Sequence, residues 1–378
     1  MKPLTDRPLA TPIALALLSL TAIAVPAAAD WSQFRGDAAL TGIAADELPA
    51  DLEPLWSFEI PDGTESTAAI VGDRVYVAGL DGKLYALALT DGQPAWTYEA
   101  TAEIKSSPSV LDGTVYLGDE YGVFHAVDAD TGKARWTFET GAGVVSSANF
   151  YGDLVVFGSY DGHLYGLRRA DGALAWKVET DNYVHATPTI AGDTAFFGGC
   201  DGYLRQVNLV DGSEKTKLQI GSYVAGSMAV RDGRAFVGTF DNEVLAIDLD
   251  DLSIAWRYDP ENRDFPFYSS PAVDGSRAVI GGRDKMIHAL SADSGEAVWT
   301  FATAARVDAS PVISGDRVFV ASNSGAVYAL DLATGEERWS YDAGAPFAAS
   351  PAVGGGRLVI GTVDGLVIAF GATGAGEQ

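Results

Sequence analysis

The chain has 378 residues and carries 51 Asp and Glu against 25 Lys and Arg, which gives a net charge of -26. Because nucleic-acid binding needs a basic surface, this charge excludes DNA or RNA as a main partner. Hydrophobic residues make up 47% of the chain, and 43 glycines and 16 prolines far outnumber 3 methionines. This composition excludes a disordered acidic chain and favours many short strands joined by turns.

Residues 1–29 have the pattern of a secretory signal peptide. Lys2 and Arg7 precede an apolar run over residues 13–25, and small residues follow as far as Ala29. Because the run is too short to span a bilayer, we expect cleavage after Ala29 rather than a retained transmembrane anchor. The mature protein is then expected to be soluble and periplasmic or secreted. The single cysteine, Cys200, excludes an internal disulfide and a CxxC metal site.

Residues 55–374 contain eight copies of one repeating unit. Seven copies end in a tryptophan, and Thr216 takes that place in the eighth. The repeat tryptophans are Trp56, Trp96, Trp136, Trp176, Trp256, Trp299 and Trp339. Turn pairs such as Asp81-Gly82 and Asp161-Gly162 mark the same copies independently. Within each copy, short β-rich runs alternate with turns, which indicates four antiparallel strands.

Eight such units predict an all-β, eight-bladed β-propeller of four-stranded antiparallel blades. The run 55–60 precedes the first full unit, while the last unit lacks its outer strand. We therefore expect the N-terminal strand to close the ring and remove its open edges. The predicted organisation is a signal peptide (1–29), an N-terminal extension (30–54), a single propeller (55–374) and a tail (375–378). The repeat tryptophans are expected to pack the blades, so Thr216 marks a weaker blade.

Two strings carry a family resemblance. AVDADTGKARW at 126–136 and ALDLATGEERW at 329–339 resemble the tryptophan-docking motif of the eight-bladed quinoprotein, or PQQ-like, propellers, and the likeness extends over 55–374. Residues 31–42 resemble the WxxFRGxxxxTG segment that precedes this repeat in secreted members. The resemblance implies either a quinone-dependent dehydrogenase or a non-catalytic scaffold such as the outer-membrane assembly lipoprotein BamB. The dehydrogenases carry long insertions, often a cysteine pair, and a calcium, whereas this chain has one cysteine and almost no insertions.

Aligning the eight units reveals a column that carries a hydroxyl in every copy. Its members are Thr67, Ser107, Ser147, Thr187, Ser227, Ser270, Ser310 and Ser350. Such residues could line a polar channel, but their recurrence favours local hydrogen bonds to the backbone at each strand start.

A second column, two residues earlier, is variable. Because strands alternate in direction, we expect it to lie on the same face as the turns between second and third strands and the insertion at 259–268. Residues that vary from repeat to repeat within a regular scaffold indicate a binding surface. The expected contact residues are Glu65, Lys105, Tyr160, His185, Phe240, Phe267, Tyr268, Arg283 and Asp308. His125 and His288 share a column but lie four blades apart, and His163 and His185 fall in other columns, so we expect no metal site.

The sequence thus predicts a non-catalytic, monomeric propeller that binds a protein or another cell-envelope component through this irregular face. We expect no catalytic residue and no cofactor. The alternative is a quinone- (PQQ) or calcium-dependent oxidoreductase, in which Asp308 is the base and Glu65 or Lys105 contacts the cofactor.

Overall fold

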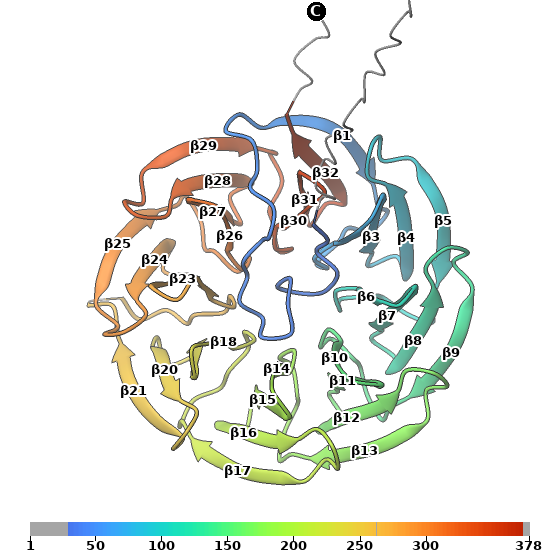
Figure 1. Ribbon diagram of the computed structural model, residues 1–378. Helices are drawn as coiled ribbons and strands as arrows, with labels where there is room; N and C mark the ends of the chain where they lie inside the picture. Colours follow the sequence, from blue (N-terminus) through green and yellow to red (C-terminus); the bar gives the residue numbers. More distant parts are fainter. Residues whose placement is uncertain (1–28, 262, 373–378) are drawn as a thin grey trace, which may run out of the picture.

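A computed structural model describes residues 29–261 and 263–372. Within these ranges there are 32 strands and no helix, so the described part contains no helix that could cross a membrane. The strands form eight four-stranded antiparallel sheets around a central axis (Figure 1). The predicted all-β eight-bladed propeller is confirmed. The expected signal peptide, apart from Ala29, and the expected tail lie outside the described residues.

The strands occupy four positions in each blade. The innermost strands are β2 (Ala69–Val71), β6 (Ser109–Leu111), β10 (Asn149–Tyr151), β14 (Thr189–Ala191), β18 (Ala229–Arg231), β22 (Ala272–Val273), β26 (Val312–Ser314) and β30 (Ala352–Gly354). The second strands are β3 (Arg74–Ala78), β7 (Thr114–Gly118), β11 (Leu154–Gly158), β15 (Thr194–Gly198), β19 (Arg234–Gly238), β23 (Arg277–Gly281), β27 (Arg317–Ala321) and β31 (Arg357–Gly361). The third strands are β4 (Lys83–Ala88), β8 (Val123–Asp128), β12 (His163–Arg168), β16 (Tyr203–Asn208), β20 (Val244–Asp248), β24 (Met286–Ser291), β28 (Ala326–Asp331) and β32 (Leu366–Gly371). The outer strands are β5 (Pro94–Glu99), β9 (Ala134–Glu139), β13 (Leu174–Glu179), β17 (Glu214–Gln219), β21 (Ser253–Tyr258), β25 (Ala297–Ala302), β29 (Glu337–Asp342) and β1 (Glu53–Glu59).

Burial follows the position of a strand in its blade. In the second blade, every residue of β7 is buried because both faces of the strand pack against neighbouring blades. The outer strand β9 alternates between exposed and half-buried residues, since one face meets water. The hydrophobic core therefore lies between blades rather than within one of them.

The repeat tryptophans join each blade to the next. Trp96 donates a hydrogen bond from Nε1 to the carbonyl oxygen of Ala129 in the following blade, at 3.0 Å. A Cβ atom on Gly132 would lie 2.6 Å from the Trp96 ring, so the turn must carry glycine there. The same tryptophan and glycine pairing recurs for Trp56, Trp136, Trp176, Trp256 and Trp299.

The blade with Thr216 replaces this contact with three linked changes. Thr216 pairs across the strands with Gln206, whereas the tryptophans pair with alanine or glycine. The Gln206 side chain donates to the carbonyl oxygen of Leu249 in the next blade, at 3.3 Å. Leu252 stands where the other blades carry the turn glycine, and it packs against the core. Gln206 and Leu252 thus make different contacts with the neighbouring residues in this blade, and Thr216 itself is exposed.

The N-terminal strand closes the ring as predicted. β1 pairs antiparallel with β32, and Trp56 lies opposite Ala369. Trp339 of the preceding blade donates from Nε1 to the carbonyl oxygen of Leu52, at 2.9 Å. The blade assembled from both parts of the chain thus makes the same kind of contact with its neighbour as the continuous blades.

Residues 29–44, here called the axial strap, cross one end of the propeller, where Figure 1 shows the blue segment over the ring centre. Trp31 exchanges two backbone hydrogen bonds with Ile70, each 2.8 Å long. The carbonyl groups of the strap accept further hydrogen bonds from Val110, Asn149, Ile190, Val230, Val273, Ile313 and Gly355. The strap therefore contacts all eight blades and covers this closed end, which leaves the opposite, open end accessible.

Candidate functional site

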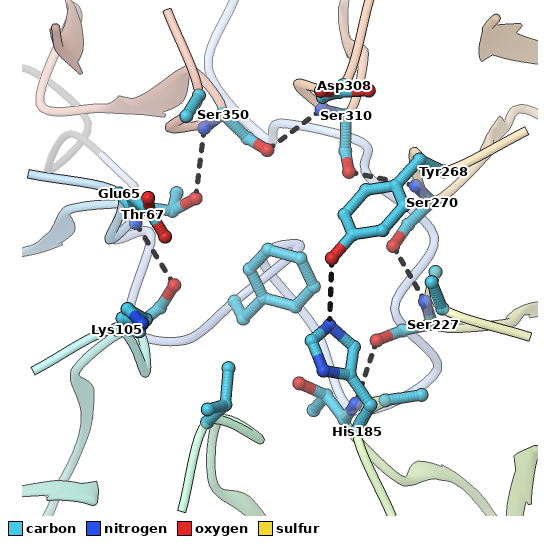
Figure 2. A pocket seen from close by; sticks show the side chains of 18 of the residues that line it. Glu65, Thr67, Lys105, His185, Ser227, Tyr268, Ser270, Asp308, Ser310 and Ser350 are labelled. Atoms are coloured by element: carbon cyan, nitrogen blue, oxygen red, sulfur yellow. Dashed lines mark hydrogen bonds between the residues drawn. The ribbon is translucent and has the colours of Figure 1, made fainter. Parts of the chain in front are cut away.

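A cavity of about 410 Å³ lies on the axis (Figure 2). Phe34 of the axial strap lines it, as does the column of eight hydroxyl residues. Its charged and aromatic lining residues come from the loops before the innermost strands and from the turns between second and third strands. These residues are Glu65, Lys105, His185, Tyr268, Arg283, Arg306 and Asp308. The cavity is therefore lined both by the recurring hydroxyl column and by variable residues of the irregular face.

The hydroxyl column forms a closed ring of hydrogen bonds. The backbone N–H of Thr67 donates to the Ser107 hydroxyl in the next blade at 3.0 Å, and the pattern repeats around the axis until Ser350 N–H donates to Thr67. The expected bonds to backbone are present. They join neighbouring blades, however, so the expectation of local bonds is wrong, and the same hydroxyls also line the cavity.

His185 is held between two tyrosines at the mouth of the cavity. The Tyr160 hydroxyl lies 2.6 Å from Nδ1 and the Tyr268 hydroxyl 3.4 Å from Nε2. Burial lowers the pKa of His185 and raises the pKa of both tyrosines. All three side chains are therefore neutral near pH 7, and they form one hydrogen-bonded group.

Further aromatic side chains extend this group over the open end. Tyr183 stacks on Tyr160 with ring centroids 4.9 Å apart, and Phe240 lies between Tyr268 and Tyr223. Tyr183 is 53% exposed and Tyr223 is 55% exposed. The aromatic residues exposed within the described ranges all belong to open-end loops, namely Tyr121, Tyr183, Tyr223, Phe240 and Phe265.

The other side of the mouth is charged. Asp308 accepts from Arg283 Nε at 2.7 Å, and Arg306 Nε lies 2.9 Å from its second oxygen. The Arg283 guanidinium also lies 4.3 Å from the centre of the Tyr268 ring, a cation–π contact that joins the two sides. Lys105 pairs with Glu120 at 3.3 Å. Partial burial would lower the pKa of Lys105, but the carboxylates of Glu120, Glu65 and Glu103 outweigh it and raise the pKa.

Most of the residues expected from the sequence meet at this mouth. Six of them line the cavity, while Tyr160 and Phe240 contact lining residues. Phe267 is the exception. It is 1% exposed and its ring packs against His288 with centroids 5.2 Å apart. Because a partner has no access to this side chain, its assignment to the binding face is wrong.

Three functional candidates were not expected from the sequence, and all belong to one column of the repeat, namely Tyr183, Tyr223 and Arg306. They lie two residues before His185, Ala225 and Asp308, members of the variable column. Extending the aligned register by this distance would have identified them, since the column holds glycine or proline in four of the other five blades.

The residues of the cavity do not fit a calcium-supported quinone. Calcium takes six to eight oxygen ligands. Within 29–261 and 263–372, no group of three or more His, Cys, Asp or Glu side chains is placed to share a metal ion. The two oxygens of Asp308 face Arg283 and Arg306, so the proposed base is already engaged by cations. We therefore derive no oxidation step through such a group.

Solved structures with the same fold include BamB and quinohemoprotein alcohol dehydrogenases. BamB from Moraxella catarrhalis shares 19% identity with a TM-score of 0.74, covering 85% of this chain and all of the other. A quinohemoprotein alcohol dehydrogenase from Pseudomonas putida HK5 shares 13% identity with a TM-score of 0.80, covering 92% of this chain and 81% of the other. At these identities the likeness shows the fold alone. A comparison with curated protein sequences gives no match.

The family assignment rests on the sequence of the propeller. A family model described as outer membrane protein assembly factor BamB matches residues 49–258, 184–286 and 283–376. These matches span most of the chain and include the residues that line the cavity, apart from Phe34. The chain belongs to this BamB family of PQQ-like propellers.

Proposed function

We propose that the protein is a non-catalytic binding propeller of the cell envelope that holds a protein partner at its open end. The BamB family assignment and the signal-peptide pattern of residues 1–29 support this function and location. The observation that carries the proposal is the distribution of exposed aromatic residues, which gather at the open end of the described structure.

Aromatic and arginine side chains supply most of the binding energy in protein interfaces. Tyr183, Tyr223 and Phe240 present apolar area to solvent, and Arg283 and Arg306 lie beside them. The closed end is covered by the axial strap and offers none of the exposed aromatic residues found in the described ranges. A partner therefore gains more buried area at the open end.

Site-specific photocrosslinking would locate the partner directly. A benzophenone amino acid is placed at Tyr183 or Tyr223, and at Asp73 or Asp293 as exposed positions in closed-end turns. After irradiation in the native envelope, both open-end positions should give the same adduct, and the closed-end positions should give none. An adduct formed only from Asp73 and Asp293 would overturn the proposal.

Replacing Tyr183, Tyr223 and Phe240 together by serine should weaken capture of that partner more than tenfold, or about 1.4 kcal/mol. The matched control replaces Leu174, Val210 and Val298 by serine, because these residues are also large, apolar and exposed but lie away from the open end. Capture should survive in the control. Far-UV circular dichroism of both variants should match the parent protein, which separates lost binding from unfolding.

The oxidoreductase alternative has a direct assay. Purified protein supplied with pyrroloquinoline quinone and calcium should give neither a bound chromophore nor dye-linked alcohol oxidation. The appearance of both would replace the binding function with an enzymatic one.

A further inference from the structure

The hydroxyl ring leaves a set of hydrogen-bond donors around the cavity. Each of the eight oxygens accepts a backbone N–H, yet none of these hydroxyls donates to another atom of the described residues. The eight residues are only 3 to 6% exposed and line the same cavity. A hydroxyl carries one O–H donor, and a buried donor without an acceptor is costly. The ring therefore favours a ligand rich in acceptor atoms.

The charges beside the ring favour an anion. The cavity lining contains Lys105, Arg283 and Arg306 against Glu65 and Asp308, and Glu120 pairs with Lys105 beside the lining. On the arginine side, one carboxylate, Asp308, serves two guanidinium groups, which leaves a local positive excess. Asp308 faces the Nε atoms of both arginines, and within the described residues neither Nη atom of Arg306 bonds to the protein. These Nη groups remain free for a second acceptor.

The hydrogen-bond donors of the lining favour some classes of ligand over others. An ammonium group brings only donors, and a neutral sugar brings donors together with acceptors. A carboxylate brings only acceptors and forms strong charge-assisted hydrogen bonds with guanidinium groups. His185 and Tyr268 are neutral and add no opposing negative charge. A carboxylate is therefore the group that best matches this side of the cavity.

The shape of the cavity indicates where that carboxylate comes from. The volume of about 410 Å³ is in the range of small-ligand pockets. Phe34 and the axial strap lie at one end of the axis, so a bound chain enters from the open end and stops inside. We infer that the cavity binds the C-terminal carboxylate of a partner chain. The preceding residues of that chain lie against Tyr183, Tyr223 and Phe240; this inference rests on the proposed function.

Two pools of random tetrapeptides, both N-acetylated, test the inference. One pool has free C-terminal carboxylates and the other has C-terminal amides. The mature protein is equilibrated with each pool, and retained peptide is quantified by mass spectrometry. The acid pool should be retained at least tenfold better than the amide pool, and its advantage should fall as salt screens the arginines.

The variant Arg306→Gln should lose most of the acid-pool advantage. Arg338→Gln is the matched control, since its side chain is 49% exposed against 54% for Arg306 and it also pairs with an aspartate. The control should retain the acid pool as the parent protein does. Equal retention of both pools, or equal loss in both variants, would refute the carboxylate site.

A third pool, amidated at the C-terminus but carrying an internal Asp, distinguishes a chain terminus from an acidic side chain. Retention of this pool at the level of the acid pool would overturn the assignment to a terminus. The failure of this inference is distinct from that of the proposed function. If the pools are not discriminated while position 183 still crosslinks the partner, only the cavity inference fails.

Discussion

The two ends of the propeller axis are built from the same repeat, but different groups surround the innermost strands at each end. At the closed end, the axial strap accepts backbone hydrogen bonds from residues such as Ile70, Ile190 and Ile313. Three residues earlier, just before these strands, the N–H groups of Thr67, Thr187 and Ser310 donate to the hydroxyl ring. At the open end, variable side chains take the place of the strap.

This difference shows how the backbone N–H groups at the inner edge of each blade find hydrogen-bond acceptors. An innermost strand has an unpaired edge that faces the axis, and unpaired backbone groups in a buried place are costly. The strap carbonyls and the ring hydroxyls accept hydrogen bonds from these groups at two positions along the axis. The variable side chains therefore lie at the open end, where they can differ between blades without loss of backbone hydrogen bonds.

The largest expected difference between the ends is in stability. Trp31 of the strap is 1% exposed, so Trp31→Ala should lower the free energy of unfolding by about 3 to 5 kcal/mol. Tyr183→Ala at the open end should change it by less than about 0.5 kcal/mol, because that side chain is half exposed. Urea unfolding followed by circular dichroism measures both. Equal losses would mean that the strap contributes no more than the open-end loops.

A second test concerns Thr216 in the outer strand β17, between the two ends. Thr216→Trp should destabilise the protein by about 1 to 3 kcal/mol, because Leu252 stands in place of the turn glycine against which the other rings pack, and Gln206 in place of the alanine or glycine opposite them. Combining it with Gln206→Ala and Leu252→Gly reproduces the pattern of the other blades and should recover most of that loss. Thermal unfolding of the single and triple variants measures the effect. A single variant as stable as the parent would show that the slot is still open.

The smallest expected effect is the pH dependence contributed by His185. Burial lowers its pKa in the folded protein below the ordinary value of 6.5. In the window below pH 6.5, the unfolded chain therefore binds a proton that the folded protein does not, and stability falls as the pH falls. His185→Gln should reduce the loss of urea resistance between pH 7.5 and pH 5. An unchanged slope would show that the imidazole makes no contribution.

Local patterns in the sequence were sufficient to predict the blades. A tryptophan, a turn glycine and a short strand recur with each unit, and each depends on contacts within a blade or with the next one. Such nearest-neighbour contacts repeat with the period of the sequence. The ring closure by β1 followed from counting strands. The variable column likewise placed Lys105, His185 and Asp308 at one end of the axis.

Only the tertiary structure decided how the non-repeating parts join this ring. The strap contacts residues as distant as Ile313 and Gly355, and no periodic pattern links residues 29–44 to them. Phe267 lies in a loop that belongs to the open end, yet its ring turns into the core against His288. Gln206 replaces a tryptophan contact through a carbonyl in the next blade. These features depend on side-chain direction and long-range packing, which strand periodicity leaves undetermined.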